Sequence, residues 1–212
     1  MVKERIQEKK VIAIVRGLPP EQLRGLVEAL YAGGIGLVEV TFNQKAPETW
    51  KDTVAGIRMI GEAFADRVIP GAGTVLTLEQ LSMACDEGAK YIISPNADEE
   101  IIRATKALGL VSMPGAFTPT EIVRAYHAGA DFVKVFPVGH LGPGYIKAVK
   151  APLSHIPLTA VGGVNEKNAA EFIAAGAAGL GVGGNLVNKE WIAKGQWDRI
   201  TALAQAYTDA VK

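Results

Sequence analysis

Short apolar runs rich in β-branched residues recur along the chain, about every 24 residues between residues 11 and 179. Most are nearly continuous in apolar side chains, which is typical of strands buried on both faces. The pattern therefore predicts eight strands, at residues 11–15, 36–41, 68–73, 91–94, 110–113, 132–136, 158–161 and 179–182.

The segments between these runs have helical spacing. Residues 21–31 place several apolar side chains on one stripe, as an amphipathic helix does. Thr77 and Thr118 each precede an acidic residue in what would be the first helical turn, a usual helix start. No linker, low-complexity stretch or charge block divides the chain, so we expect residues 1–212 to form a single domain.

Eight strand–helix units with short loops favour a parallel sheet with right-handed crossovers. Closed on itself, such a sheet is a (β/α)₈ barrel, an α/β fold also called a TIM barrel. Residues 2–9 would add an N-terminal helix that caps the barrel bottom. The rival fold is an open doubly wound sheet, but no GxGxxG motif follows the first strand and no acidic residue takes the ribose-binding position.

The composition of the chain excludes several classes of function. The 22 basic and 22 acidic side chains give zero net charge, which argues against nucleic-acid or anionic-membrane partners. The single cysteine, Cys85, excludes an internal disulfide and a Cys-rich metal site, and fits a reducing compartment. The charged first ten residues are unlike a signal peptide, and no apolar run is long enough to span a bilayer. We expect a soluble, cytoplasmic protein.

Two charged residues lie within apolar strands. Lys134 stands inside the run at residues 132–136, where burial would lower its pKa and make the amine a nucleophile. Glu39 stands inside the run at residues 36–41 and could be a general base. Alternatively, Lys134 is a structural lysine and Glu39 its neutralising partner. Arg16 ends the first strand and could clamp a carboxylate, or be an ordinary surface arginine.

Glycine pairs end several strands. Gly162-Gly163 and Gly183-Gly184 follow the seventh and eighth strands, the common phosphate position in this fold. The alternative is tight turns without a ligand. The three histidines are scattered and form no metal-binding motif, so neither a metal nor another cofactor is expected.

Together these segments resemble the aldolases of 2-keto-3-deoxy-6-phosphogluconate and 4-hydroxy-2-oxoglutarate (KDPG and KHG), from about Val11 to Asn188. The resemblance rests on the following segments: Glu39-Val40-Thr41, Gly71-Ala72-Gly73-Thr74, Ile93-Ser94-Pro95, Met113-Pro114-Gly115, Phe132-Val133-Lys134-Val135-Phe136-Pro137 and Gly162-Gly163-Val164. It implies a cofactor-free class I aldolase, commonly a homotrimer, that releases pyruvate from a 2-keto-4-hydroxy acid. The other product would be glyceraldehyde 3-phosphate or glyoxylate.

The resemblance also implies roles for individual residues. Lys134 would form a Schiff base with the substrate ketone, and Glu39 would move protons. Thr74 would hydrogen-bond the pyruvate portion, with Pro95 and Phe136 as pocket walls. The cradle for the distal carboxylate or phosphate would consist of Gly162, Gly163, Gly183 and Gly184.

Three positions depart from the family pattern. Asn43 stands where some members have an arginine, so Arg16 would take over the carboxylate clamp. Val161 stands where many members have threonine. Asn185 replaces a serine, and its amide could still donate to a phosphate. These changes affect substrate choice. Two other functions are also compatible with the residues: a phosphosugar epimerase or isomerase with Glu39 as base, and a non-catalytic sugar-acid binding module.

Overall fold

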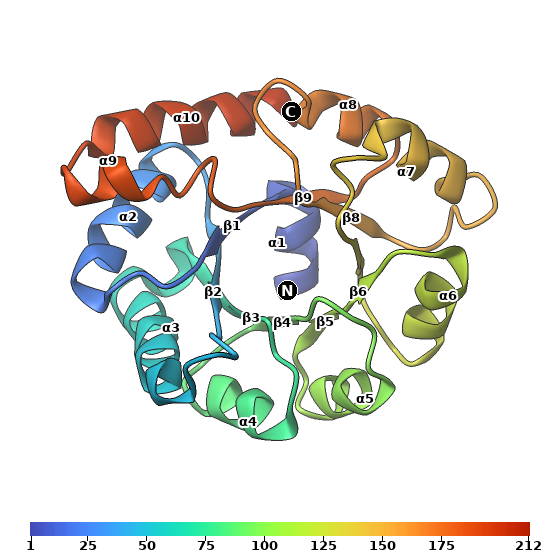
Figure 1. Ribbon diagram of the computed structural model, residues 1–212, viewed down its shortest axis with the longest axis horizontal. Helices are drawn as coiled ribbons and strands as arrows, with labels where there is room; N and C mark the ends of the chain where they lie inside the picture. Colours follow the sequence, from blue (N-terminus) through green and yellow to red (C-terminus); the bar gives the residue numbers. More distant parts are fainter.

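A ring of parallel strands surrounded by helices makes up the computed structural model, which describes residues 1–212 (Figure 1). All strands belong to one sheet. They are β1 (Val11–Val15), β2 (Leu37–Thr41), β3 (Ile69–Gly73), β4 (Tyr91–Ile93), β5 (Val111–Met113), β6 (Gly115–Ala116), β7 (Val133–Val135), β8 (Leu158–Val161) and β9 (Gly179–Val182).

The order of the strands closes the ring. It runs β5-β4-β3-β2-β1-β9-β8-β7-β6, so the two edge strands are consecutive in the chain and only Pro114 separates them. Proline has no N–H to give to the ladder, although the Pro114 carbonyl accepts from Lys134 N at 2.8 Å. Strands β5 and β6 therefore act as one interrupted strand, and eight such units form the barrel. The (β/α)₈ prediction is confirmed, and the open doubly wound sheet is wrong.

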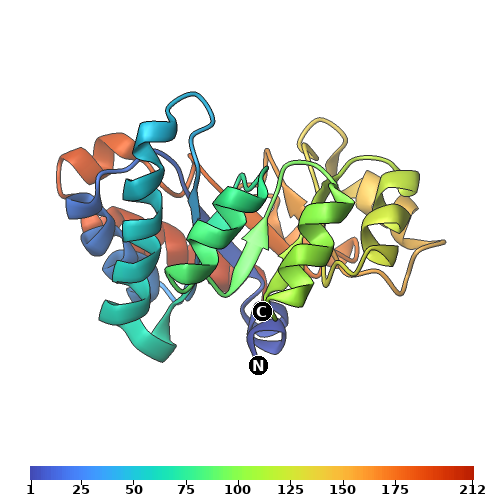
Figure 2. The same ribbon diagram turned by 90° about the horizontal axis from the view of Figure 1, so that it is seen from below.

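The helices lie outside the ring, except α1, which lies beneath it (Figure 2). None is long and apolar enough to cross a lipid bilayer. They are α1 (Val2–Lys9), α2 (Pro20–Ala32), α3 (Trp50–Phe64), α4 (Leu78–Asp86), α5 (Glu99–Ala107), α6 (Pro119–His127), α7 (Gly142–Lys150), α8 (Ala169–Ala174), α9 (Lys189–Ala193) and α10 (Trp197–Ala210), with 3₁₀ turns at Pro47–Thr49 and Ala65–Arg67.

The predicted helix starts are confirmed. The Thr77 side chain accepts from Gln80 N at the start of α4. At α6, Thr118 and Glu121 form a reciprocal capping box, which satisfies backbone N–H groups that have no partner within the helix.

Apolar side chains form two cores because neighbouring strand residues point to opposite faces. The larger core lies between strands and helices, and includes Val38, Val40, Val133 and Val135. The smaller core fills the lower barrel interior, where Ile6 of α1 packs against the strands. Charged side chains placed between outward-facing valines must therefore point into the barrel.

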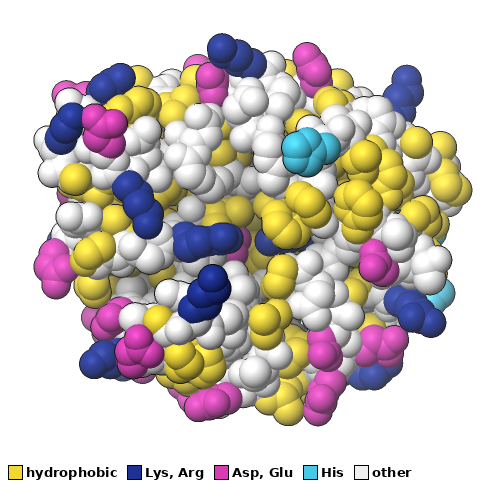
Figure 3. Space-filling view, in the orientation of Figure 1, with side chains coloured by type: hydrophobic (Ala, Val, Ile, Leu, Met, Phe, Trp, Pro, Cys, Tyr) yellow, Lys and Arg dark blue, Asp and Glu magenta, His cyan; other side chains and the backbone are white.

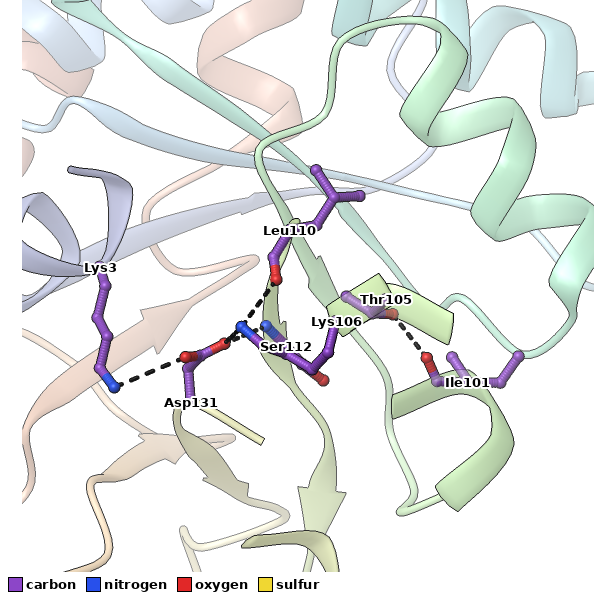
Figure 4. A network of polar contacts seen from close by, with 7 residues as sticks. All are labelled: Lys3, Ile101, Thr105, Lys106, Leu110, Ser112 and Asp131. Carbon is purple, nitrogen blue, oxygen red and sulfur yellow. Dashed lines mark hydrogen bonds and ion pairs between the residues drawn. The ribbon is translucent and has the colours of Figure 1, made fainter. Parts of the chain in front are cut away.

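A polar network ties the bottom of the barrel together (Figure 4). The Asp131 carboxylate accepts from Ser112 N at 3.0 Å and from Lys106 Nζ at 2.6 Å, and Lys3 Nζ lies 3.6 Å away. Lys106 also donates to the Leu110 carbonyl at 3.2 Å. One carboxylate thereby connects α1, α5, β5 and the segment that enters β7.

Candidate active site

Lys134 and Glu39 both lie inside the barrel. Each stands between two outward-facing valines, so alternation along β7 and β2 turns both side chains inward. Their exposed fractions are only 7% for Lys134 and 1% for Glu39. The amine of Lys134 lies 4.9 Å from the centre of the Phe136 ring. The two charged residues singled out in the sequence are thus buried in one interior.

Burial and mutual attraction act in opposite directions on this pair. Burial lowers the pKa of Lys134 below 10.5, an effect that Arg16 reinforces and the Glu39 charge opposes. Burial raises the pKa of Glu39 above 4.5, while the positive charges of Lys134 and Arg16 act against that rise. Both shifts favour the uncharged forms, a neutral amine and a carboxyl group that holds its proton more readily than a solvated glutamate does.

A cavity of about 510 Å³ opens at the carboxyl ends of the strands, where barrels of this kind carry their chemistry. Figure 3 shows basic side chains and an acidic one around the hollow at the centre of this face. The predicted residues that line the cavity are Arg16, Phe136, Gly162, Gly163, Gly183, Gly184 and Asn185. The structure therefore brings the predicted anion cradle and the proposed clamp into one cavity.

The Gly162-Gly163 pair turns the chain at the cavity wall. Both residues have left-handed backbones, with φ of 89° and 79°, which side chains other than glycine rarely adopt. A Cβ on Gly163 would lie 2.6 Å from Gly139 Cα, so the loop after β8 packs directly on the loop after β7.

Thr74 and Pro95 follow β3 and β4 at the same end of the barrel, but neither lines the cavity described above. The Thr74 backbone is strained, with φ of 57°. Two glutamines hold this loop. Gln44 donates to the Thr74 carbonyl at 2.7 Å, and the buried Gln80 donates to Gln44 at 2.9 Å and accepts from Leu76 N at 2.7 Å. The sequence analysis did not identify either glutamine.

Asn185 lines the cavity, and its amide already has two partners within the protein. Its nitrogen donates to Glu166 Oε2 at 2.9 Å and to the Tyr207 hydroxyl at 2.7 Å. An amide group carries two N–H bonds, and both are used within the protein. Asn185 thus connects the loop after β9 to α10.

Lys189, which the sequence analysis missed, also lines the cavity. Its amine lies 3.9 Å from the position that a Cβ on Gly17 would take, close to Arg16 in the chain. The residue opens α9, a position where the helix dipole disfavours a cation. A lysine at the start of a helix is therefore the sequence signal that could have identified Lys189 as a functional residue. Neither Lys189 nor Arg16 forms an ion pair with a carboxylate of the protein.

Comparison with known proteins places this arrangement in a family. A model of KDPG and KHG aldolases matches residues 2–203. A probable 2-dehydro-3-deoxy-6-phosphogalactonate aldolase of Rhizobium meliloti (strain 1021) is 40% identical over 205 residues, 96% of this chain and 93% of the relative. The 2-dehydro-3-deoxy-6-phosphogalactonate aldolase of Escherichia coli (strain K12) is 37% identical over 203 residues, 95% and 96% of the two chains.

A solved structure of similar fold is also an aldolase of this kind. It is the KDPG aldolase of Legionella pneumophila with pyruvate captured as a covalent carbinolamine, which superposes with a TM-score of 0.86. Its sequence is 27% identical, and the match covers 98% of each chain. With a barrel, an interior lysine and a family model that covers nearly every residue, the chain belongs to the KDPG and KHG aldolase family.

Proposed function

We propose that this class I aldolase cleaves a 2-keto-3-deoxy-6-phospho sugar acid, with Lys134 as the Schiff-base lysine and Glu39 as the proton carrier. The observation that carries the proposal is the buried Lys134–Glu39 pair in the barrel, at the same end as a cavity with two unpaired cations at its wall. A binding module has no need to desolvate an amine, and an epimerase has no need of a nucleophilic one.

The steps of the proposed cleavage follow from the protonation states of Lys134 and Glu39. The neutral amine of Lys134 attacks the C2 ketone, and the carbinolamine takes a proton from Glu39 and loses water to give an iminium. Glu39 takes the proton of the C4 hydroxyl, the C3–C4 bond breaks, and its electrons pass into the enamine of pyruvate while an aldehyde leaves. A proton returned to C3 restores the iminium, and water releases pyruvate and the free amine.

The cavity wall supports a phosphorylated substrate. Arg16 and Lys189 lack carboxylate partners within the protein, and the glycine pairs leave backbone groups accessible. A phosphate dianion satisfies two cations better than a single carboxylate does. Two relatives named as phosphogalactonate aldolases favour the galactonate epimer, with pyruvate and glyceraldehyde 3-phosphate as products.

Borohydride reduction with pyruvate tests the Schiff base, because only an imine is converted into a stable adduct. We expect the adduct on Lys134, no turnover in Lys134→Ala, and unchanged turnover in the control Lys147→Ala on the outer helix α7. Glu39→Gln should slow cleavage by roughly two to four orders of magnitude, as for loss of a general base. Cleavage retained in the Lys134 variant would eliminate the mechanism.

Comparison of kcat/KM for the galactonate epimer, KDPG and KHG tests the substrate. Lys189→Ala should raise KM for the two phosphorylated acids by about tenfold, as expected for loss of one charged contact, and leave KHG unaffected. The control is Lys194→Ala, since Lys194 pairs with Glu190 on the same helix. Equal losses for KHG would contradict a phosphate role for Lys189.

The homotrimer implied by the family resemblance, and the cytoplasmic location expected from the sequence, are also part of the proposal. Light scattering of the purified protein checks the first of these expectations.

A further inference from the structure

Several buried polar atoms of the barrel have no hydrogen-bond partner in the protein. Among them are Glu39 Oε2 and the Tyr91 hydroxyl. Tyr91 is completely buried within the inner core. A buried hydroxyl without a partner is destabilising, and phenylalanine would fill the same space without that cost. The hydroxyl of Tyr91 therefore requires an explanation.

Two glycines of β3 place Tyr91 directly below Glu39. A Cβ on Gly71 would lie 2.1 Å from the Tyr91 ring, and a Cβ on Gly73 would lie 1.7 Å from Glu39 Oε1. Glu39 of β2 and Tyr91 of β4 thus fill the spaces beside two consecutive inward positions of β3. Strand register agrees, since Gly71 pairs with Glu39 on one side and with Tyr91 on the other.

Charged and titratable groups reach Glu39 from three other strands. Lys134 comes from β7, Arg16 from the end of β1 and Tyr91 from β4. Lys134 and Arg16 are cations. Burial, with a smaller contribution from the Glu39 charge, raises the pKa of Tyr91 well above 10, so its hydroxyl keeps its proton and can only be a neutral donor toward a carboxylate.

We propose that Tyr91 is a positioning residue for the aldol reaction, whose hydroxyl donates to Glu39 Oε2 across one water, since neither atom has a hydrogen-bond partner within the protein. This inference rests on the role proposed for Glu39. The donor holds the carboxylate in one orientation beneath the substrate and stabilises its charged form. Glycine at both 71 and 73 gives the two side chains the room that this contact needs.

The test is Tyr91→Phe, which removes only the hydroxyl, with Tyr31→Phe on the outer helix α2 as the matched control. Loss of the donor destabilises charged Glu39 and raises its pKa. The acid limb of kcat/KM should therefore move to higher pH by about one unit, and kcat should fall about tenfold. Borohydride trapping with pyruvate should persist, because Lys134 is intact. An unmoved acid limb with the parent kcat would overturn the proposal.

A second variant keeps the test independent of whether Tyr91→Phe folds. Replacement of Tyr91 by 3-fluorotyrosine makes the hydroxyl more acidic and hence a stronger donor, so the acid limb should move to lower pH. No movement, or movement in the same direction as the phenylalanine variant, would contradict the contact. Full activity in Glu39→Gln would instead refute the role of Glu39, and this inference with it.

Discussion

At the scale of single residues, the site depends on a lysine and a glutamate that the fold removes from water. Their flanking valines predict burial from the sequence alone, since a charge within an apolar strand has nowhere else to go. The contacts of the Asn185 amide could not be predicted in this way. Its amide partners, Glu166 and Tyr207, are distant in sequence, and no local pattern reports such contacts.

The neighbours of Lys134 set the pH at which its amine becomes reactive. The rate of borohydride trapping with saturating pyruvate should rise with pH as Lys134 loses its proton, with a midpoint below 10.5. Glu39→Gln removes a negative charge that raises this pKa, so the midpoint should fall. Arg16→Gln removes a positive charge that lowers it, so the midpoint should rise. Shifts in one direction for both variants would contradict this electrostatic account.

At the scale of elements, strand β3 supplies space instead of side chains. Its inward positions after Ile69 are glycines, and these leave room for groups carried by the neighbouring strands. Gly71 and Gly73 were visible in the sequence, within one of the segments on which the family resemblance rests. Which side chains they make room for could not be predicted, because that depends on the register between β2, β3 and β4.

Gly73→Ala tests this packing. A Cβ at residue 73 would occupy the place of the Glu39 carboxylate, so we expect kcat to fall at least a hundredfold, since misplaced catalytic groups have such effects. Circular dichroism should show that the barrel is retained. The control is Gly61→Ala in helix α3, where a Cβ would meet nothing within 4 Å. That change should leave kcat intact and raise stability by about 0.5–1 kcal/mol.

At the scale of the whole molecule, the two ends of the barrel have separate tasks. The carboxyl ends of the strands carry the cavity, and the amino ends carry the Asp131 network. Strand positions followed from hydrophobic periodicity, because it is a local property of the chain. The Asp131 network did not, because its members are far apart in sequence.

Asp131→Ala should therefore lower stability and spare catalysis. It leaves Ser112 N without its acceptor and Lys106 with only the Leu110 carbonyl, and we expect a loss of about 2–3 kcal/mol in the free energy of unfolding. Urea denaturation measures the loss, and kcat should be unchanged. Asp209→Ala, which breaks an exposed pair with Lys212, should alter neither property. A large loss of kcat in Asp131→Ala would mean that the two ends are coupled.

The position of α1 has a consequence for the order in which products depart. With Ile6 packed into the lower interior, the barrel is a well with a single opening. In the reaction proposed above, the keto-acid fragment stays bonded to Lys134 inside this well after the C3–C4 bond breaks. The aldehyde must then leave first through the one opening, and on the return path the keto acid must enter first.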